Sequence, residues 1–435
     1  MIGHRHRLLL IAVFLCQGLL AGDNYESLFR QAANFSSQRK YVEAVQCYQA
    51  ALKIRPHAPE ALNNLAVMYY ALGDYKRAWE TTIQLIRGKQ DSPSVDLVAG
   101  LSAVRIGIPA EAVAPLERML RREPANRDGL LGLASAHVAL NQLPEAAAIY
   151  QQQIKRSSND SIAWYGLAIC NERMAEAASK TLAEMPGGRA YSKQLLGEFL
   201  LSRGDKKLAQ EAFGESAASG STRSPEAARQ FEKAKSLANA SQAAFVRFLQ
   251  IAPDSWQSHL FLGDLNRQHR KFADSLEEYK KAAAAQPQDP GPLLGIGTVY
   301  WELGDFDRAE QYLRQVLHLN PNSMTAIFEL ANIDVRRHKD LEAIPLLETY
   351  LKAQPDALSA RADLGRAYLH LKKFEEAARE LKLALPVDTG GEIHYQLSIA
   401  LRKLGHIQEA DEALHKSAEI RRAELQREQR LHSVK

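Results

Sequence analysis

Residues Pro290 to Ser323 read PGPLLGIGTVYWELGDFDRAEQYLRQVLHLNPNS, and this stretch predicts two helices joined by a tight turn. Its first half carries apolar residues at helical spacing from Leu293 to Leu303. Gly304 ends that helix, because a residue without a Cβ readily adopts the left-handed conformation common at helix C-termini. A second amphipathic run stops at Asn320-Pro321, since proline cannot continue a helix. The stretch is therefore a helical hairpin.

The same pattern recurs along the chain at a fixed interval of 34 residues. Three kinds of position share this interval: a closing proline, a small residue in the second helix, and a turn residue. They are Pro253, Pro287, Pro321 and Pro355; Ala44, Ala78, Ala112 and Ala146, then Ala309, Ala343 and Ala377; and Gly73, Gly107 and Asn141. The small residues let the two helices of a hairpin approach closely. The whole chain is therefore predicted to be an array of repeats.

These residues resemble the tetratricopeptide repeat, which has a period of about 34 residues and a pattern W-x2-L-G-x2-Y, then A-x3-F, then P. The matching residues are Leu293, Ile296, Gly297, Tyr300, Ala309, Leu313 and Pro321, an earlier set Leu62, Leu65, Ala66, Tyr69 and Ala78, and the opening Trp164, Leu167 and Ala168. About eleven or twelve copies run from Tyr25 to about Leu425. The resemblance implies an all-α, right-handed superhelical solenoid of antiparallel helix pairs that binds protein partners without catalysis.

The repeat spacing also predicts how the chain is divided. Pro124 and Pro253 are 129 residues apart, seven short of four intervals, so the copies between them are shortened or fused. We expect this irregular segment to alter the curvature of the array or to act as a hinge. The predicted segments are a signal peptide at 1–22, four repeats at 25–160, the irregular repeats at 161–255 with a flexible loop at 216–224, regular repeats at 256–425, and a polar capping helix or tail at 416–435.

The first residues are typical of an export signal. His4 to Arg7 make a basic start, Leu8 to Leu20 form a short apolar run, and Ala21-Gly22 offers small residues for cleavage. Thirteen residues are too few to span a bilayer comfortably. We therefore expect an exported protein, periplasmic or secreted, with an uncleaved membrane anchor as the alternative.

Composition argues against several other classes of protein. The chain has 435 residues, of which 46% are hydrophobic and 24% are charged, as in ordinary folded proteins. The net charge is +4, and the Lys and Arg residues are interspersed with Asp and Glu along the chain. This pattern gives no indication of nucleic-acid binding, which needs clustered positive charge. Of the three cysteines, Cys47 and Cys170 lie several repeats apart, so no disulfide is expected to hold the fold together.

No catalytic or cofactor motif stands out. The sequence lacks HExxH, GxSxG, a phosphate loop and CxxC. Gly291, Gly295 and Gly297 lie inside a predicted helix with no strand before it, so they are interpreted as structural. The thirteen histidines are scattered over separate repeats, and no metal site, cofactor or small-molecule substrate is expected.

The resemblance does imply a binding surface. In that family, ligands lie in the concave groove along the first helix of each copy, chiefly at its second, fifth, ninth and twelfth positions. Here those positions hold Phe29, Asn63, Tyr70, Tyr165, Tyr191, Asp264, Trp301, Phe328, Asn332, Arg366, Tyr395 and Arg402. Aromatic rings offer rigid contact area to an extended peptide or a partner helix. Each ring could equally serve packing between repeats.

Three functions remain open from the sequence. The leading hypothesis is an exported scaffold that binds one or more protein partners. The second is a membrane-anchored assembly factor of a cell-envelope or secretion complex. The third and weakest is an enzyme with its site in the irregular segment 161–255.

Overall fold

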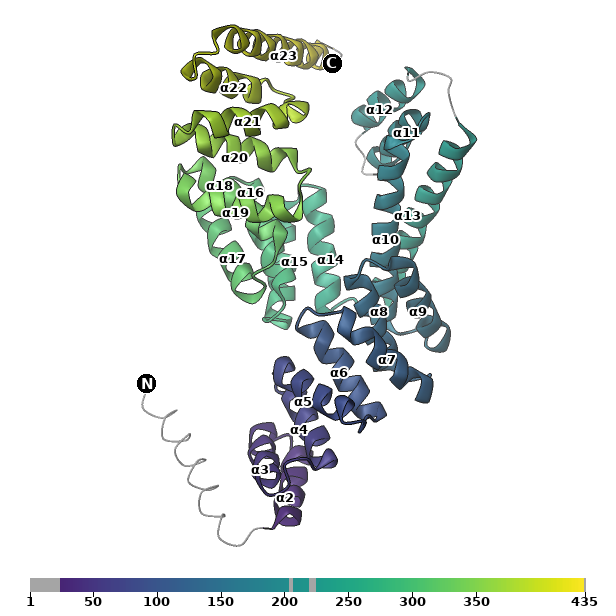
Figure 1. The fold of residues 1–435 in the computed structure, drawn as a ribbon. Helices are drawn as coiled ribbons and strands as arrows, with labels where there is room; N and C mark the ends of the chain where they lie inside the picture. Colours follow the sequence, from purple (N-terminus) through teal and green to yellow (C-terminus); the bar gives the residue numbers. More distant parts are fainter. Residues whose placement is uncertain (1–23, 203–205, 219–223, 434–435) are drawn as a thin grey trace. The chain divides into compact units, whose positions relative to one another are not determined.

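The computed structural model describes residues 24–202, 206–218 and 224–433, and every regular element among them is a helix (Figure 1). The predicted all-α solenoid of helix pairs is confirmed. The predicted leader, residues 1–22, lies outside the described residues, as does most of the predicted loop 216–224. Within the described residues, no helix combines the length and the apolar character needed to cross a membrane.

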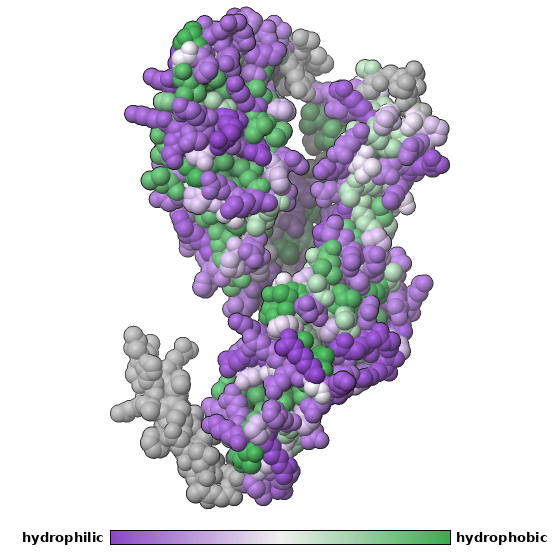
Figure 2. Space-filling model, viewed as in Figure 1, coloured by the Kyte–Doolittle hydropathy of each residue, from purple (hydrophilic) through white to green (hydrophobic). Residues whose placement is uncertain are grey.

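The chain divides into two compact units, with the boundary between Ala252 and Pro253. In each unit, neighbouring helices pack as antiparallel pairs, and Figure 2 shows mainly hydrophilic residues on the visible surface of each. The first unit contains α2 (Tyr25–Ser37), α3 (Tyr41–Ile54), α4 (Pro59–Ala71), α5 (Tyr75–Arg87), α6 (Pro93–Arg105), α7 (Ala110–Arg122), α8 (Arg127–Ala139), α9 (Leu143–Arg156), α10 (Ser161–Glu184), α11 (Gly188–Ser202), α12 (Lys206–Ala218) and α13 (Pro225–Ile251).

The second unit continues the regular pattern. It contains α14 (Trp256–Gln268), α15 (Phe272–Ala285), α16 (Pro290–Glu302), α17 (Phe306–Leu319), α18 (Met324–Arg336), α19 (Asp340–Ala353), α20 (Leu358–His370), α21 (Phe374–Ala384), the short η1 (Leu385–Val387), α22 (Glu392–Lys403) and α23 (Ile407–Ser433). The predicted polar terminal helix is therefore the continuation of α23, the second helix of the last pair.

The turn inside a pair both closes one helix and starts the next. Gly304 has φ +74°, and the amides of Gly304 and Asp305 donate to the carbonyls of Trp301 and Tyr300 at 3.0 and 2.9 Å. These are the bonds that satisfy the last carbonyls of a helix. The Asp305 carboxylate then accepts from the amide of Arg308 at 3.2 Å and caps α17. Two residues thus fix the reversal of the chain.

The predicted small residues lie where the two helices of a pair cross. All seven are fully buried: Ala44, Ala78, Ala112, Ala146, Ala309, Ala343 and Ala377. Apolar residues of the two helices fill the space around them, as Ile296 and Leu313 do in the α16–α17 pair. The first helices of successive pairs also contact one another, for example α14 with α16 and α16 with α18. Each unit therefore has one face built from first helices.

The irregular segment contains a pairing that the spacing does not predict. The sequence predicts shortened or fused copies here. In the structure the long helices α10 and α13 pack against each other, and α11 with α12 forms a hairpin inserted between them in the sequence. The hydroxyl of Ser241 donates to the carbonyl of Ala168 at 3.0 Å, and the Gln230 amide donates to the carbonyl of Ala178 at 3.0 Å. Figure 1 shows α11 and α12 near one end of the α10–α13 pair. The expected hinge or change of curvature stays a prediction.

Replacement of a buried residue tests how closely a pair is packed. Leu313 in α17 is fully buried, so Leu313→Ala should lower the free energy of unfolding by about 2–5 kcal/mol through lost contacts and a cavity. Leu341 in α19 is 73% exposed, and Leu341→Ala should change it by less than about 0.5 kcal/mol. Urea unfolding followed by circular dichroism measures both. Equal effects of the two substitutions would contradict this packing.

Candidate protein-binding face

The first helices of the second unit, α14, α16, α18, α20 and α22, together form one surface, which we call the inner face. This face carries a column of polar residues. Four first helices in succession have one at the same position: Asp264, Thr298, Asn332 and Arg366. In the first unit the equivalent positions of α4, α6 and α8 hold Val67, Leu101 and Ser135, of which only the serine is polar. An unbroken run of four polar residues at this position therefore occurs in the second unit and not in α4, α6 and α8.

Two members of this column are hydrogen-bonded to acids of the next pair. The hydroxyl of Thr298 donates to the Glu329 carboxylate at 2.9 Å, and the amide of Asn332 donates to the Asp363 carboxylate at 2.8 Å. Each bond joins residues 31 positions apart, so each acid lies one helical turn before its counterpart in the column. Glu329 and Asp363 are only 6% and 5% exposed. We call these four residues the polar ladder.

The polar ladder holds three larger side chains in place. The Trp301 indole nitrogen donates to the Asn332 oxygen at 3.1 Å, and the Arg336 guanidinium donates to the same oxygen at 2.9 Å. The guanidinium of Arg366 lies 3.1 Å from the Asp363 carboxylate. Trp301 and Arg366 are partly exposed and Arg336 is exposed. An aromatic ring and two cations are thus presented in fixed orientations.

Burial raises the pKa of both acids of the polar ladder, Glu329 and Asp363. Desolvation raises the pKa of the Glu329 carboxyl to about 7, although the hydrogen bond from Thr298 opposes the rise. Desolvation likewise raises the pKa of Asp363, against the hydrogen bond from Asn332. A raised pKa favours the neutral acid. Of the two acids, Asp363 is the one that interacts with the guanidiniums of Arg366 and Arg336, and both cations oppose the rise of its pKa.

A third cation, Arg267, lies on α14, the first helix of this face. The Arg267 guanidinium pairs with the Glu302 carboxylate at 2.7 Å, and the hydroxyl of Tyr279 donates to Asp264 at 2.6 Å. Desolvation raises the pKa of Asp264, although the hydrogen bond from Tyr279 and the charge of Arg267 oppose the rise. The chemistry of the face is thus hydrogen-bond donation, positive charge and aromatic contact.

Several predicted aromatic residues instead serve packing inside the first unit. Phe29 lies 5.9 Å from Tyr25 and 5.6 Å from Tyr48, measured between ring centroids. Tyr165 packs on Phe245 and Phe248 of α13, and Tyr191 packs on Phe231. Tyr70 makes an edge contact with Tyr75, and Asn63 accepts from the Ser94 hydroxyl at 3.1 Å. The structure does not gather these side chains into one site.

The remaining predicted residues lie in the second unit. Phe328 stacks on Tyr350 of the same pair at 5.0 Å. Tyr395 is 40% exposed, with the Arg421 guanidinium 5.4 Å from its ring centroid, and Arg402 pairs with Asp411. Only Trp301, Asn332 and Arg366 are brought together through shared partners.

The positions implied by the resemblance miss Glu329, Asp363 and Arg336. Glu329 and Asp363 occupy a sixth position, where the two preceding pairs have Phe261 and Gly295. An acid at such a position, 31 residues after Thr298 or Asn332, is the signal that could have identified them.

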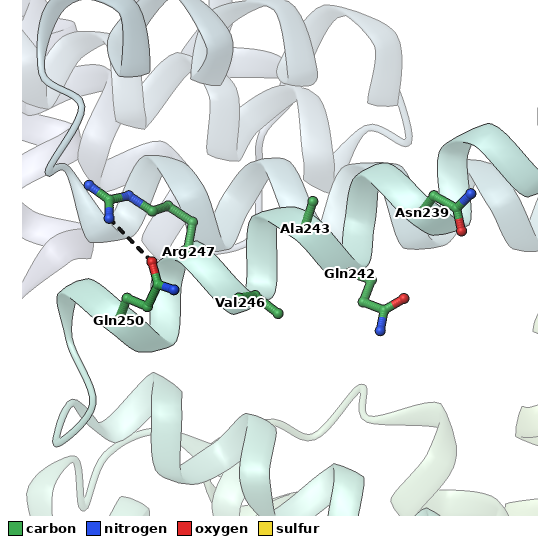
Figure 3. A pocket seen from close by; sticks show the side chains of 6 residues that line it. All are labelled: Asn239, Gln242, Ala243, Val246, Arg247 and Gln250. Carbon is green, nitrogen blue, oxygen red and sulfur yellow. Dashed lines mark hydrogen bonds between the residues drawn. The ribbon is translucent and has the colours of Figure 1, made fainter. Parts of the chain in front are cut away.

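The irregular segment offers a shallow pocket on α13. Figure 3 shows its lining on one stretch of that helix: Asn239, Gln242, Ala243, Val246, Arg247 and Gln250. The Arg247 guanidinium donates to the Gln250 side-chain oxygen at 3.2 Å. One ionisable side chain gives no nucleophile with a partnered base. The pocket therefore lends no support to an enzymatic site there.

Comparison with known proteins gives consistent matches to repeat families. Family models described as TPR repeat or tetratricopeptide repeat match residues 35–73, 107–170, 216–290, 266–332 and 341–396, more than half of the chain in total. The chain is 24% identical over 332 residues to cellulose synthase operon protein C of Xanthomonas axonopodis pv. citri. It is 30% identical over 152 residues to a CTR9 homolog of Arabidopsis thaliana.

These relatives are much longer proteins. The matches cover 65% and 34% of this chain but only 21% and 14% of the two relatives. Among solved structures, MamA from Desulfovibrio magneticus RS-1 is 24% identical, with a TM-score of 0.36 over 39% of this chain and 97% of its own. The TPR protein YrrB, whose crystal structure is described as having an unusual peptide-binding site, is 17% identical, with a TM-score of 0.36 over 41% of this chain and 92% of its own.

The raised pKa of Glu329 predicts a pH dependence. Because the folded state holds this proton up to about pH 7 and the unfolded chain releases it near 4.5, the contribution of Glu329 to stability falls as pH rises between these values. Glu329→Gln removes that loss, so the variant should gain up to about 3 kcal/mol relative to wild type between pH 5 and pH 8. Urea unfolding at both pH values measures the difference. A difference that stays constant with pH would contradict the assignment.

Proposed function

We propose, since the chain belongs to the tetratricopeptide repeat proteins, that it is an exported scaffold that binds protein partners on the inner face of its second unit. The observation that carries this proposal is the polar ladder. Its bonds fix Trp301, Arg336 and Arg366 before any partner arrives. Side chains that are already ordered lose less entropy on binding.

The chemistry of this face favours one kind of ligand. Arg336 and Arg366 supply guanidinium groups that can bind carboxylates, and their own acidic neighbour Asp363 has a raised pKa. Trp301 supplies a rigid apolar surface beside them. We therefore propose that the partner contributes an extended peptide segment that carries Asp or Glu next to an apolar residue.

Charge reversal on the inner face tests this proposal. Arg336 is exposed, so Arg336→Glu should leave the fold intact but repel an acidic segment. Trp301→Ala removes the apolar contact. Each variant, used as bait in the native host with quantitative mass spectrometry, should recover the partner roughly tenfold less than wild type, the loss typical of a central contact residue.

The matched control is Arg314→Glu, the same substitution in the second helix α17. The Arg314 side chain is 58% exposed, and its pairing with Glu310 at 2.7 Å is a surface ion pair of small energetic value. This variant should recover the partner as well as wild type does. Equal recovery by all variants would exclude the inner face as the binding surface.

Export is supported by the basic start and the apolar run of residues 4–20. Intact-mass measurement on the protein from its native host should show loss of about the first 22 residues. A full-length mass in the membrane fraction would instead favour the anchored assembly factor. Neither outcome affects the test of the inner face, because that face lies in residues 256–403.

A further inference from the structure

One corner of the second unit breaks the repeat pattern with a buried acid. The other regular second helices begin with an apolar residue: Tyr41, Tyr75, Ala110, Leu143, Phe272, Phe306, Phe374 and Ile407. Helix α19 begins instead with Asp340, whose side chain is only 4% exposed. A buried carboxylate is costly unless it is paired or binds a metal. Asp340 therefore needs a hydrogen-bond donor or a cation close to its carboxylate.

Two histidines lie beside this carboxylate. The Nδ1 of His370, the last residue of α20, is 2.9 Å from the Asp340 carboxylate. The ring of His338, in the turn between α18 and α19, has its centroid 4.4 Å from that of His370. The next repeat has Lys372 at the turn after α20, and its first helix α22 ends with Lys403 where α20 ends with His370. Acid and histidines thus depart from the pattern together, and two successive pairs contribute to the cluster.

The geometry of the cluster suits a metal ion. One potential ligand atom from each of His338, Asp340 and His370 lies within 4.8 Å of the other two. Zinc bonds of about 2.0–2.2 Å in a tetrahedron place neighbouring ligand atoms roughly 3.4 Å apart. The His370 and Asp340 atoms are already as close as this, and His338 is exposed, so rotation of its side chain can close the remaining gap.

The nearby cations do not compete for the carboxylate. The ammonium of Lys339 lies 3.4 Å from Glu310, and the Arg337 guanidinium pairs with Asp307 at 2.6 Å. The negative charge of Asp340 is therefore left to His370 and to a bound cation. Two imidazoles and one carboxylate form a ligand set typical of zinc, with the fourth position open to water or to a partner.

We propose that His338, Asp340 and His370 bind one Zn²⁺ ion. The ion joins the α18–α19 turn to the end of α20, so it fastens two successive helix pairs of the second unit together. The site stands independently of the proposed binding face, since it uses none of the residues that form the polar ladder.

Zinc titration of the purified chain, without a polyhistidine tag and after treatment with a chelator, tests this site. Calorimetry should show one Zn²⁺ bound per chain, and added Zn²⁺ should raise the unfolding temperature, because an ion that binds only the folded state stabilises it. His338→Lys introduces the residue that the next repeat carries at the same left-handed backbone position, Lys372 with φ +61°. It should fold normally and bind Zn²⁺ roughly tenfold more weakly or worse.

A second variant and a control complete the test. Asp340→Phe with His370→Lys introduces the residues of the next repeat, Phe374 and Lys403, and should abolish the thermal response to Zn²⁺. His415→Ala, at a side chain 76% exposed on α23, should keep wild-type affinity and stoichiometry. The proposal is wrong if wild type and His338→Lys bind Zn²⁺ equally, or if wild type shows no saturable binding.

Discussion

Close approach of two helix backbones is the constraint on which every pair depends. The buried alanines at the crossings leave room for nothing larger, and the first helices are equally tight: a Cβ added at Gly263 would lie 2.5 Å from Tyr279, and one at Gly100 would lie 2.3 Å from Leu116. Large side chains of the second helix occupy the space that small residues of the first leave free. Interlocking of this kind fixes the distance between the helices and lets each pair present an apolar side to the next.

The polar ladder differs from the rest of the packing between pairs, which is mainly apolar. Buried acids in a helical stack are expensive, and apolar residues would often give a more stable interior. Glu329 and Asp363 are accommodated because each accepts a hydrogen bond from the preceding pair and because burial shifts them toward the neutral form. What the stack gains is orientation: the ladder connects three successive first helices and keeps the indole and guanidinium groups above it in place.

The repeat spacing was enough to predict the helix pairs, their turns and their crossing residues, because each of these depends on contacts within about 34 residues. It could not predict that α10 pairs with α13. The α11–α12 hairpin between them follows the repeat pattern itself, because Gly197 faces Phe213 as Gly263 faces Tyr279. The local sequence therefore indicates consecutive pairs.

The candidate site was only partly accessible from sequence for a similar reason. The family positions identified Trp301, Asn332 and Arg366, but helical spacing alone does not separate a ring that lines a groove from one that fills a core, as Tyr165 does. The acids of the ladder become visible only when two repeats are compared at an offset of 31 residues rather than 34.

The pairing of α10 with α13 also sets an order of events during synthesis. Most helices here meet a neighbour that is made within the next twenty residues, whereas Ala168 must wait for Ser241, 73 residues later. During that delay the side of α10 that carries Leu182 lacks Ala227 and Phe231 of α13, the residues it packs against in the folded chain. Closing such a long loop costs more entropy and slows folding. The ribosome-bound chain therefore passes through a stage in which its centre is the part most open to aggregation and to chaperones.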